Sequence, residues 1–477
     1  MKKIALLLLM SLLISAVSSC GGEPTESKTS SSDDTTPAEE TVDTEVPIAD
    51  LDGYKFRILS FGDHGLNSMW AEAETGSLIN DAVYKKIRTV EERLNCDITL
   101  AENASISSGT GNSNLIKSPI LADEDAFDLV GYHDITLAGM SLEGMFINLY
   151  KIPSLDFSKP WWPEFTVESL SVGNKMYLFS NYLSYQRTME THVLFFNKTL
   201  LTDNGVDFPY SSVKDGSWTF DKLSSITKLG NKDLNGDSVM DENDQYGAVN
   251  NPYYYGVMEA YRLEPYQHDA DGNLTYVFDL DKYQTLVEKL FNFFRGEGSF
   301  TTTKGSETFQ MFANGQAMFT HGNISEAITI YSASNVIYGV LPMPKVDETQ
   351  DDYYSGCNDK PLAVPITAAP NIDKIGMIIE NLSAEGYRQV YPVLFEQALK
   401  ARYADQSEDA DMFDIINKNS ILSFSYIYGE NSPYNNMLEK LFAGKNPNTN
   451  VASYAASIKA SQEKRVATLN EKFAGLD

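Results

Sequence analysis

The apolar and polar residues after position 50 follow the pattern of a strand and then a helix. Residues 54–59 alternate with a period of two and end in an apolar run, which predicts the first strand. Asn80 or Asp81 caps a predicted helix whose apolar residues are spaced by four, three and four: Val83, Ile87, Val90 and Leu94. Residues 96–100 and 127–130 are again typical of strands. Strand, helix and strand in this order predict a parallel βαβ unit, and hence an α/β lobe.

The remaining pattern predicts a second lobe. The chain has 477 residues, of which about 430 remain once a leader and a polar stalk are set aside, and this is too many for one hydrophobic core. Residues 191–196 and 338–342 predict strands of the second lobe. The C-terminal third is mostly helical in pattern, as the apolar spacing over 375–382 indicates.

The N-terminus predicts export. Two lysines precede an apolar run over 4–14, which is too short to span a membrane, so residues 1–19 are a predicted signal peptide. The sequence Val17-Ser18-Ser19-Cys20 resembles the lipobox of bacterial lipoproteins, which implies that Cys20 carries lipid. Residues 20–49 are rich in Ser, Thr, Asp, Glu and Pro and predict a disordered linker. We therefore expect an extracytoplasmic protein anchored to the cell membrane.

The charge of the chain excludes one class of partner. The formal net charge is −29, and removal of the two lysines in the leader brings the processed chain to −29 − 2 = −31. Such an excess of carboxylates repels nucleic acid and anionic lipid. The lipid, rather than a basic patch, would hold the protein to the membrane. Cys96 and Cys357 remain after Cys20, and the sequence leaves open whether they pair.

One acidic segment has the spacing of a calcium loop. Oxygen-bearing side chains stand at positions 1, 3, 5, 9 and 12 of a twelve-residue stretch, and a main-chain carbonyl would serve at position 7. The predicted ligands are Asp233, Asn235, Asp237, Val239, Asp241 and Asp244. Ser238 stands where Gly is expected, and Asp244 is shorter than the usual Glu. The alternative is an acidic turn without metal; we expect one structural calcium ion.

No enzyme signature is present in the sequence. It lacks G-x-S-x-G, H-E-x-x-H, the P-loop pattern and G-x-G-x-x-G after a strand. We therefore expect a binding protein without catalytic residues. Ligands of α/β lobes bind beyond the carboxyl ends of strands. Trp70, Tyr132 and Asp134 follow predicted first-lobe strands, and Asn181 follows the apolar segment 177–179, so all four are candidate ligand contacts.

Several segments together resemble the sugar-binding type of extracellular solute-binding proteins of bacterial ABC importers. The resemblance covers roughly residues 52–477, and its segments are Phe195-Phe196-Asn197-Lys198, Gly216 to Asp221, Asp233 to Gly247, Phe312 to Met318, Gly322, Tyr338 to Pro344 and Ala368 to Asn371. Ile324 stands where many relatives carry a Trp that stacks on sugar.

The resemblance implies an α/β fold of two lobes, periplasmic-binding-protein-like, with a ligand cleft between them and crossing hinge strands. The implied division is 50–190 and 358–402 for the first lobe, and 191–357 and 403–477 for the second. Tyr254 and Asn323 would line the cleft from the second lobe. We expect a monomer that binds an oligosaccharide and delivers it to ABC permease subunits.

Two other functions stay open at this point. A secreted glycan-active enzyme could use carboxylate pairs that sequence alone does not reveal among 66 acidic residues. A surface adhesin or sensor could use the same fold without transport. The identity and size of the ligand are also open, and amino sugars or peptides remain alternatives because the 60–79 loop is acidic.

Overall fold

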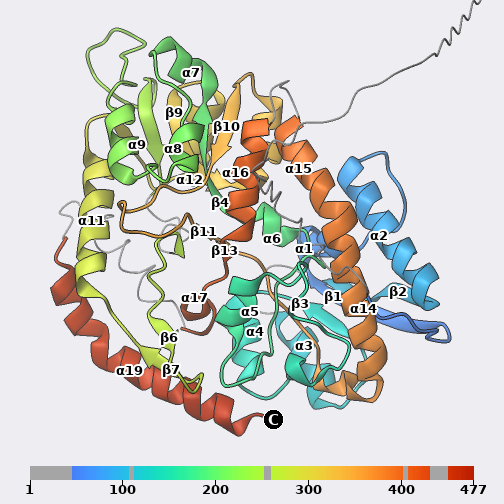
Figure 1. Cartoon of the computed structure of the whole chain (residues 1–477). Coiled ribbons are helices and arrows are strands. Elements are labelled where there is room, and N and C mark those ends of the chain that lie inside the picture. The colour runs from blue at the N-terminus through green and yellow to red at the C-terminus, as the bar shows by residue number, and fades with distance from the viewer. Residues whose placement is uncertain (1–45, 107–111, 252–258, 401–406, 430–448) are drawn as a thin grey trace, which may run out of the picture. The chain divides into compact units, whose positions relative to one another are not determined.

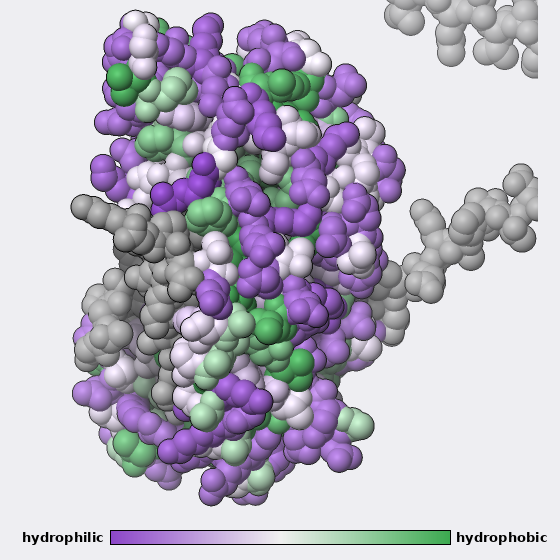
Figure 2. Space-filling model, turned by 90° about the vertical axis from the view of Figure 1, so that its left-hand side faces the viewer, coloured by the Kyte–Doolittle hydropathy of each residue, from purple (hydrophilic) through white to green (hydrophobic). Residues whose placement is uncertain are grey.

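The computed structural model describes residues 46–106, 112–251, 259–400, 407–429 and 449–477 (Figure 1). Cys20 and Tyr254 therefore lie outside the described residues. Within the described part, no helix has the length and apolar character needed to cross a membrane. On the face shown in Figure 2, hydrophilic residues cover most of the surface and hydrophobic ones lie in small groups between them.

The first sheet contains the predicted βαβ unit. Its strands lie in the order β12-β3-β1-β2, with bounds Leu362–Ala363, Leu129–Gly131, Tyr54–Phe61 and Cys96–Ile106. β1 is parallel to both β2 and β3, and β12 is antiparallel to β3. Helix α2 (Leu78–Leu94) makes the crossover, and its four predicted apolar residues are buried. Asn95 ends the helix in the left-handed conformation, at a φ of 47°.

The second sheet is mixed. Its order is β10-β4-β9-β5-β8, with bounds Tyr338–Leu341, His192–Asn197, Ala317–Asn323, Tyr246–Asn250 and Ser299–Thr301. β4 is antiparallel to both β9 and β10, whereas β5 is parallel to β9 and β8. Both strands predicted for the second lobe are confirmed.

Smaller elements complete the chain. Two short pairs of strands are β6 (Tyr266–His268) with β7 (Leu274–Tyr276), and β11 (Ser355–Gly356) with β13 (Ser420–Ile421). The helices up to the second sheet are α1 (Gly62–Met69), α3 (Asn114–Leu121), α4 (Asp134–Ser141), η2 (Leu149–Lys151), α5 (Glu164–Leu170) and α6 (Gln186–Met189).

The later helices are α7 (Lys198–Asp203), α8 (Tyr210–Lys214), α9 (Phe220–Thr227), α11 (Leu280–Arg295), α12 (Gly305–Ala313), α13 (Ile324–Thr329), η3 (Tyr331–Ala333), η4 (Ile366–Asn371), α14 (Ile372–Glu385), η5 (Gly386–Val390), α15 (Tyr391–Lys400), α16 (Ser407–Lys418), α17 (Phe424–Tyr428) and α19 (Val451–Gly475).

Each sheet has its own hydrophobic core. Strand β4 shows why the second sheet carries apolar side chains on both faces. Leu194 and Phe196 point into one cluster of buried residues, and Val193 and Phe195 point into another, because successive side chains of a strand alternate between its faces. The structure thus confirms the two-lobed α/β fold.

Core membership departs from the predicted division in two places. The β6–β7 hairpin lies in the range predicted for the second lobe, yet Tyr266 and Leu274 are buried in the core of the first sheet. The long helix α19 contributes Val451 to a core of the second sheet and Leu469 and Phe473 to that of the first. The apolar residues near its two ends therefore serve different cores.

Three of the tryptophans are buried in the cores, and the two cysteines after Cys20 are unpaired. Trp218 is buried, and its Nε1 donates to Pro342 O at 3.2 Å. Trp161 and Trp162 are buried too, and both donate to the same carboxylate, that of Glu380 in α14. These rings belong to the core rather than to a ligand site. Cys96 and Cys357 are free thiols.

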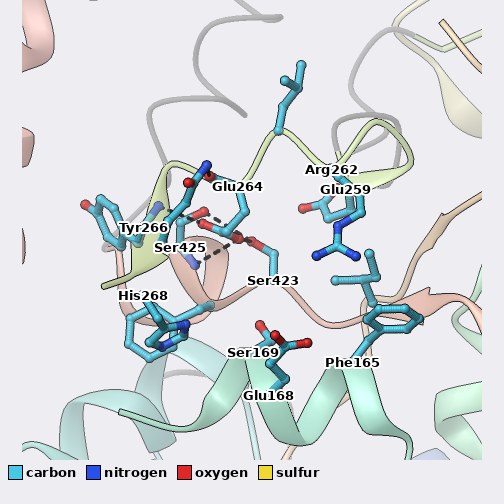
Figure 3. A pocket seen from close by; sticks show the side chains of 14 residues that line it. Phe165, Glu168, Ser169, Glu259, Arg262, Glu264, Tyr266, His268, Ser423 and Ser425 are labelled. Carbon is cyan, nitrogen blue, oxygen red and sulfur yellow. Dashed lines mark hydrogen bonds between the residues drawn. The ribbon is translucent and has the colours of Figure 1, made fainter. Parts of the chain in front are cut away.

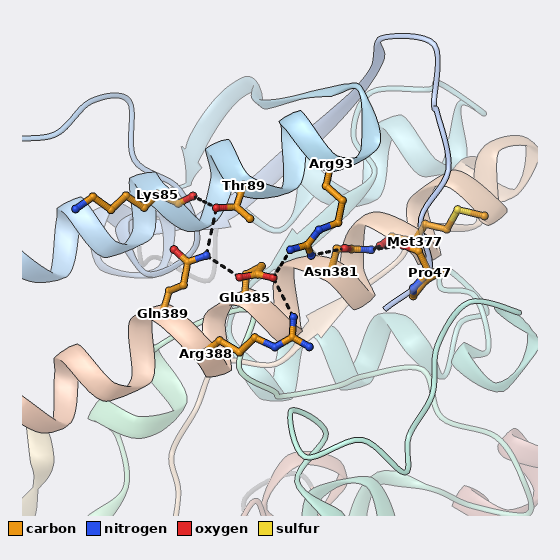
Figure 4. A network of polar contacts seen from close by, with 9 residues as sticks. All are labelled: Pro47, Lys85, Thr89, Arg93, Met377, Asn381, Glu385, Arg388 and Gln389. Carbon is orange, nitrogen blue, oxygen red and sulfur yellow. Dashed lines mark hydrogen bonds and ion pairs between the residues drawn. The ribbon is translucent and has the colours of Figure 1, made fainter. Parts of the chain in front are cut away.

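A polar network joins helix α2 to α14 and η5 (Figure 4). Arg93 donates from Nη2 to Glu385 Oε1 at 2.7 Å and from Nη1 to Asn381 Oδ1 at 2.9 Å. Arg388 and Gln389 donate to the same glutamate. Burial alone would raise the pKa of Glu385, but hydrogen bonds from Gln389 and Arg93, together with the arginine charges, bring it below its ordinary value.

Candidate functional site

A cavity of about 340 Å³ lies where three segments far apart in sequence meet (Figure 3). Helix α5 lines one side, the stretch from 259 to 268 that leads into β6 lines another, and residues 421–425 between β13 and α17 complete it. Cavities of this size, with apolar walls and a few polar groups, are typical of small-molecule sites.

Helix α5 presents one face to the cavity. Phe165, Glu168 and Ser169 are three and four residues apart, which places them on the same side of the helix. Ser169 Oγ donates to Leu422 O at 2.7 Å and so ties the helix to the 421–425 segment. Glu168 is exposed and leaves its carboxylate at the mouth of the cavity.

Arg262 is held in an unusual position at the edge of the cavity. Its φ is +51°, a left-handed backbone conformation that non-glycine residues rarely adopt. Its guanidinium carbon lies 5.1 Å from the ring centroid of Phe165 and 5.1 Å from that of Tyr354. Strained backbone of this kind concentrates at functional sites, where the surrounding structure maintains it. In Figure 3 the guanidinium points from the 259–268 stretch toward Phe165.

Glu264 is the best-satisfied carboxylate of the site. Its Oε2 accepts hydrogen bonds from Ser423 Oγ at 2.7 Å and from the Ser425 amide at 3.5 Å, and its Oε1 accepts from the Tyr266 amide at 3.2 Å. Burial raises the pKa of Glu264, and these hydrogen bonds act against that increase.

Glu259 has fewer donors than Glu264, because the hydrogen bond that acts on its carboxyl group comes from its own backbone amide. Its Oε2 is buried and has no hydrogen-bond partner among the described residues. Burial raises the pKa of Glu259 to about 8, and the nearby charge of Glu264 raises it as well. An acceptor that is shielded from water and unpaired is costly in the empty protein, and a ligand that donates to it relieves that cost.

Aromatic rings supply the apolar part of the lining. Phe424 lies next to Tyr266 and His268, with ring centroids 6.5 and 6.4 Å away at steep interplanar angles. Together with Phe165 on the opposite side, they give the cavity flat apolar faces between its charged groups. Flat rings combined with carboxylates suit a ligand that has both C–H faces and hydroxyl or amino donors.

None of the predicted ligand residues that the structure describes lines this cavity. Trp70 packs partly buried against the first core, and its Nε1 donates to Ile98 O at 3.1 Å. Tyr132 is fully buried in that core. Asn181 is buried as well, with hydrogen bonds to Ser383 Oγ and the Leu183 amide.

Asp134 and Asn323 are placed in polar surroundings. Asp134 begins helix α4 and lies 2.9 Å from His133 Nδ1. Burial would raise the pKa of Asp134, but His133 and the Lys360 charge lower it below its ordinary value. Asn323 caps α13, and its Nδ2 donates to Glu190 Oε2 at 3.0 Å. The predicted contacts of these residues with a ligand stay predictions.

The residues that do line the cavity carry no pattern that sequence reasoning could have used. Glu259, Arg262 and Glu264 belong to neither a clear strand nor a clear helix in the sequence. One faint signal was available in the sequence: the three consecutive tyrosines at 253–255 come just before these residues.

The predicted calcium loop is an exposed turn stabilised by its own carboxylates. Asp233 accepts from the amides of Gly236 and Ser238, and Asp237 accepts from the Val239 amide. Ser238, which stands where Gly was expected, has a φ of +66°. Across the described residues, no group of three or more His, Cys, Asp or Glu side chains is arranged to hold a metal ion. Calcium binding stays a prediction.

Comparison with known proteins places the fold. No protein-family model and no curated protein sequence matches the chain. Solved structures do match. The GacH receptor of Streptomyces glaucescens GLA.O shares 14% identity over 86% of this chain and 99% of its own, with a TM-score of 0.55. The protein has the two-lobed fold of solute-binding proteins.

Two further structures show how widely this fold is used. A cyclo/maltodextrin-binding protein, solved with maltotetraose, shares 15% identity over 89% of this chain and 100% of its own, with a TM-score of 0.54. UgpB from Mycobacterium tuberculosis, solved with glycerophosphocholine, shares 11% identity over 88% and 99%, with a TM-score of 0.55. The fold therefore accommodates ligands of different chemistry, and the side chains of each site decide among them.

Proposed function

We propose that the protein is an extracytoplasmic receptor that binds an oligosaccharide and delivers it to an ABC importer. The observation that carries this proposal is the cavity between α5, the 259–268 stretch and the 421–425 segment, with its rings and carboxylates. The similar structures support it, because two of them are named as a receptor solved with acarbose and a binding protein solved with maltotetraose.

The binding mechanism follows from the lining. Phe165 offers a flat face to the C–H side of a sugar ring, and the carboxylates of Glu259 and Glu264 accept hydrogen bonds from hydroxyl groups. Arg262 is a donor at the edge for a ring or hydroxyl oxygen. Binding is reversible, and closure of the two lobes around the ligand presents it to the permease.

Isothermal titration calorimetry of the purified protein against a panel of oligosaccharides tests the proposal. Phe165→Ala should weaken binding about five- to 150-fold, because a stacked aromatic ring contributes about 1–3 kcal/mol. Tyr150→Ala, an exposed aromatic residue outside the cavity, is the matched control and should leave affinity unchanged. Equal losses in both variants, or no binding by the wild type to any sugar, would overturn the proposal.

A reducing-end assay on the same samples separates the receptor from a glycan-active enzyme. A receptor leaves the oligosaccharide intact, whereas an enzyme releases new reducing ends at each cleavage. Permease genes next to the gene for this protein would favour the importer over an adhesin or sensor with the same fold.

The membrane location and the bound calcium ion are further proposals that rest on the sequence. The lipobox-like sequence at Cys20 supports a lipid anchor in the cell membrane. The oxygen spacing over 233–244 supports one structural calcium ion, for which Asp233, Asn235, Asp237, Asp241 and Asp244 would supply side-chain oxygens and Val239 a carbonyl. The 233–244 loop does not line the ligand cavity.

A further inference from the structure

The cavity is lined by more carboxyl groups than cationic groups. Three carboxyl groups line it, those of Glu168, Glu259 and Glu264, against the single guanidinium of Arg262. No ion pair joins Arg262 to any of the three in the described part of the chain. Its guanidinium instead lies beside the edge-to-face pair of Phe165 and Tyr354, 5.1 Å from each ring centroid. The positive charge is thus committed to the edge of the cavity, and the carboxyl groups have no cationic partner.

We propose that the cavity selects ligands that carry a protonated amino group, which pairs with Glu259 and Glu264. This inference rests on the proposed function and narrows it from oligosaccharides in general to amino-bearing ones. The inference specifies the amino group that is recognised, and it does not specify the sugar that carries this group.

Glu259 and Glu264, both half-buried, have complementary needs that one ammonium group would meet. Glu264 is held in place by neutral donors, the Ser423 hydroxyl and the amides of Tyr266 and Ser425, which fix its orientation and leave its charge uncompensated. Glu259 Oε2 accepts from no described residue. An ammonium group has three donors and a full charge, so it can bond both carboxylates where a hydroxyl group bonds one.

The carboxyl group of Glu259 would have to lose its proton in order to pair with an ammonium group. Glu259 is largely protonated at neutral pH, because burial and the charge of Glu264 raise its pKa to about 8. The other titratable or charged groups of the lining are Arg262, Tyr266 and His268 from the same stretch and Glu168 from α5. When an ammonium group binds, Glu259 ionises and its proton is released to solvent. A neutral sugar would leave that proton in place.

The experiment compares two ligands with the same sugar backbone, one with free amino groups and one in which these groups are acetylated. Tetramers of glucosamine and of N-acetylglucosamine share one sugar backbone, and maltotetraose serves as a neutral reference. We expect the deacetylated tetramer to bind at least about tenfold tighter than the acetylated one, as one charge-assisted contact would give. Its measured enthalpy should change with the ionisation enthalpy of the buffer at pH 7, which reports proton release, and that of the acetylated tetramer should not.

A variant assigns the effect to the cavity. Glu259→Gln should reduce the ratio of the two affinities toward one, and Glu297→Gln, which alters an exposed glutamate outside the cavity, should keep the wild-type ratio. Equal binding of both tetramers by the wild type, or an unchanged ratio in Glu259→Gln, would overturn the inference. If the acetylated tetramer or maltotetraose binds without any preference for the amine, the receptor function stands and this inference alone fails. If no oligosaccharide binds, both fail.

Discussion

Replacing Glu380 by glutamine should make the stability of the protein less dependent on pH. Glu380 lies in α14, is 1% exposed, and accepts a hydrogen bond from Trp161 Nε1 on one oxygen and from Trp162 Nε1 on the other, both at 2.8 Å. Arg388 stacks over the Trp161 ring but forms no ion pair with this carboxylate among the described contacts. Glutamine keeps the size of the side chain and removes its charge.

The sign and size of the effect follow from the pKa. Burial raises the pKa of Glu380 from 4.5 to about 7, although the two indole hydrogen bonds oppose that increase. Between these values the folded state holds a proton that the unfolded state has lost, so the free energy of unfolding falls as the pH rises. At about 1.4 kcal/mol for each pH unit, Glu380 removes about 3 kcal/mol of stability between pH 4.5 and pH 7.

The glutamine variant lacks this change but has a constant cost. Its carbonyl oxygen accepts from one indole, and its amide group leaves the other indole N–H unpaired, which costs about 1–3 kcal/mol at every pH. We therefore expect Glu380→Gln to be less stable than the wild type near pH 5 and about as stable near pH 8.

Urea denaturation of both proteins at several pH values measures this difference. Comparison with the wild type at each pH cancels the contribution of other buried carboxyl groups, such as Glu326 and Asp359, to the free energy of unfolding. Glu297→Gln, at an exposed position, is the matched control and should keep the wild-type dependence on pH. A constant offset between wild type and Glu380→Gln from pH 5 to pH 8 would refute the reasoning.

Three further predictions concern other parts of the chain. Lys86 is buried in α2 with its Nζ donating to Leu183 O, and burial lowers its pKa to about 7. The wild type should therefore gain stability as the pH rises from about 7 toward 10, because the unfolded state binds the extra proton there, and urea titrations of Lys86→Met should lack that gain. If the 233–244 loop binds calcium, EDTA should lower the melting temperature of the wild type and have no effect on Asp237→Ala; unchanged melting and no metal by elemental analysis would leave the loop as a turn. Cys20→Ala should release the protein from the membrane fraction or leave it unprocessed, and unchanged detergent partitioning would count against a lipid anchor.

The elements that the sequence predicts well are those with a strong periodic pattern. Helix α2 was predictable because its apolar residues recur every three or four positions and Asn95 ends it. The N-cap predicted at Asn80 or Asp81 is wrong, because the helix begins at Leu78 after Ser77 and Asp81 lies in its first turn. The buried strands β1 and β4 and the cap of α9 at Thr219 have similarly local signals. The hairpin β6–β7 could not be assigned to its core, because nothing in its sequence says which of two apolar surfaces covers Tyr266.

The candidate site was harder to predict because its parts are distant in sequence. Phe165, Glu264 and Ser423 meet only through the packing of the first core, and each alone is an unremarkable residue of a short helix or a connecting segment. The reasoning from strand ends selected Tyr132, which follows β3, and Asn181, which follows the buried segment 177–179. It gave no information on whether their side chains face a ligand or the core, and the structure buries both.

The position of the cavity links ligand binding to the arrangement of the two cores. Leu263 belongs to a core of the second sheet and Tyr266 to that of the first, so the chain crosses between them at Glu264. A second crossing lies between Ile416 and Leu422, and Ser423 follows it directly. The hydrogen bond from Ser423 to Glu264 joins these two crossings, and both line the cavity. A ligand held there touches the segments that must bend when one core moves relative to the other. Its binding free energy therefore differs between conformations, which is the condition for a ligand to shift their populations.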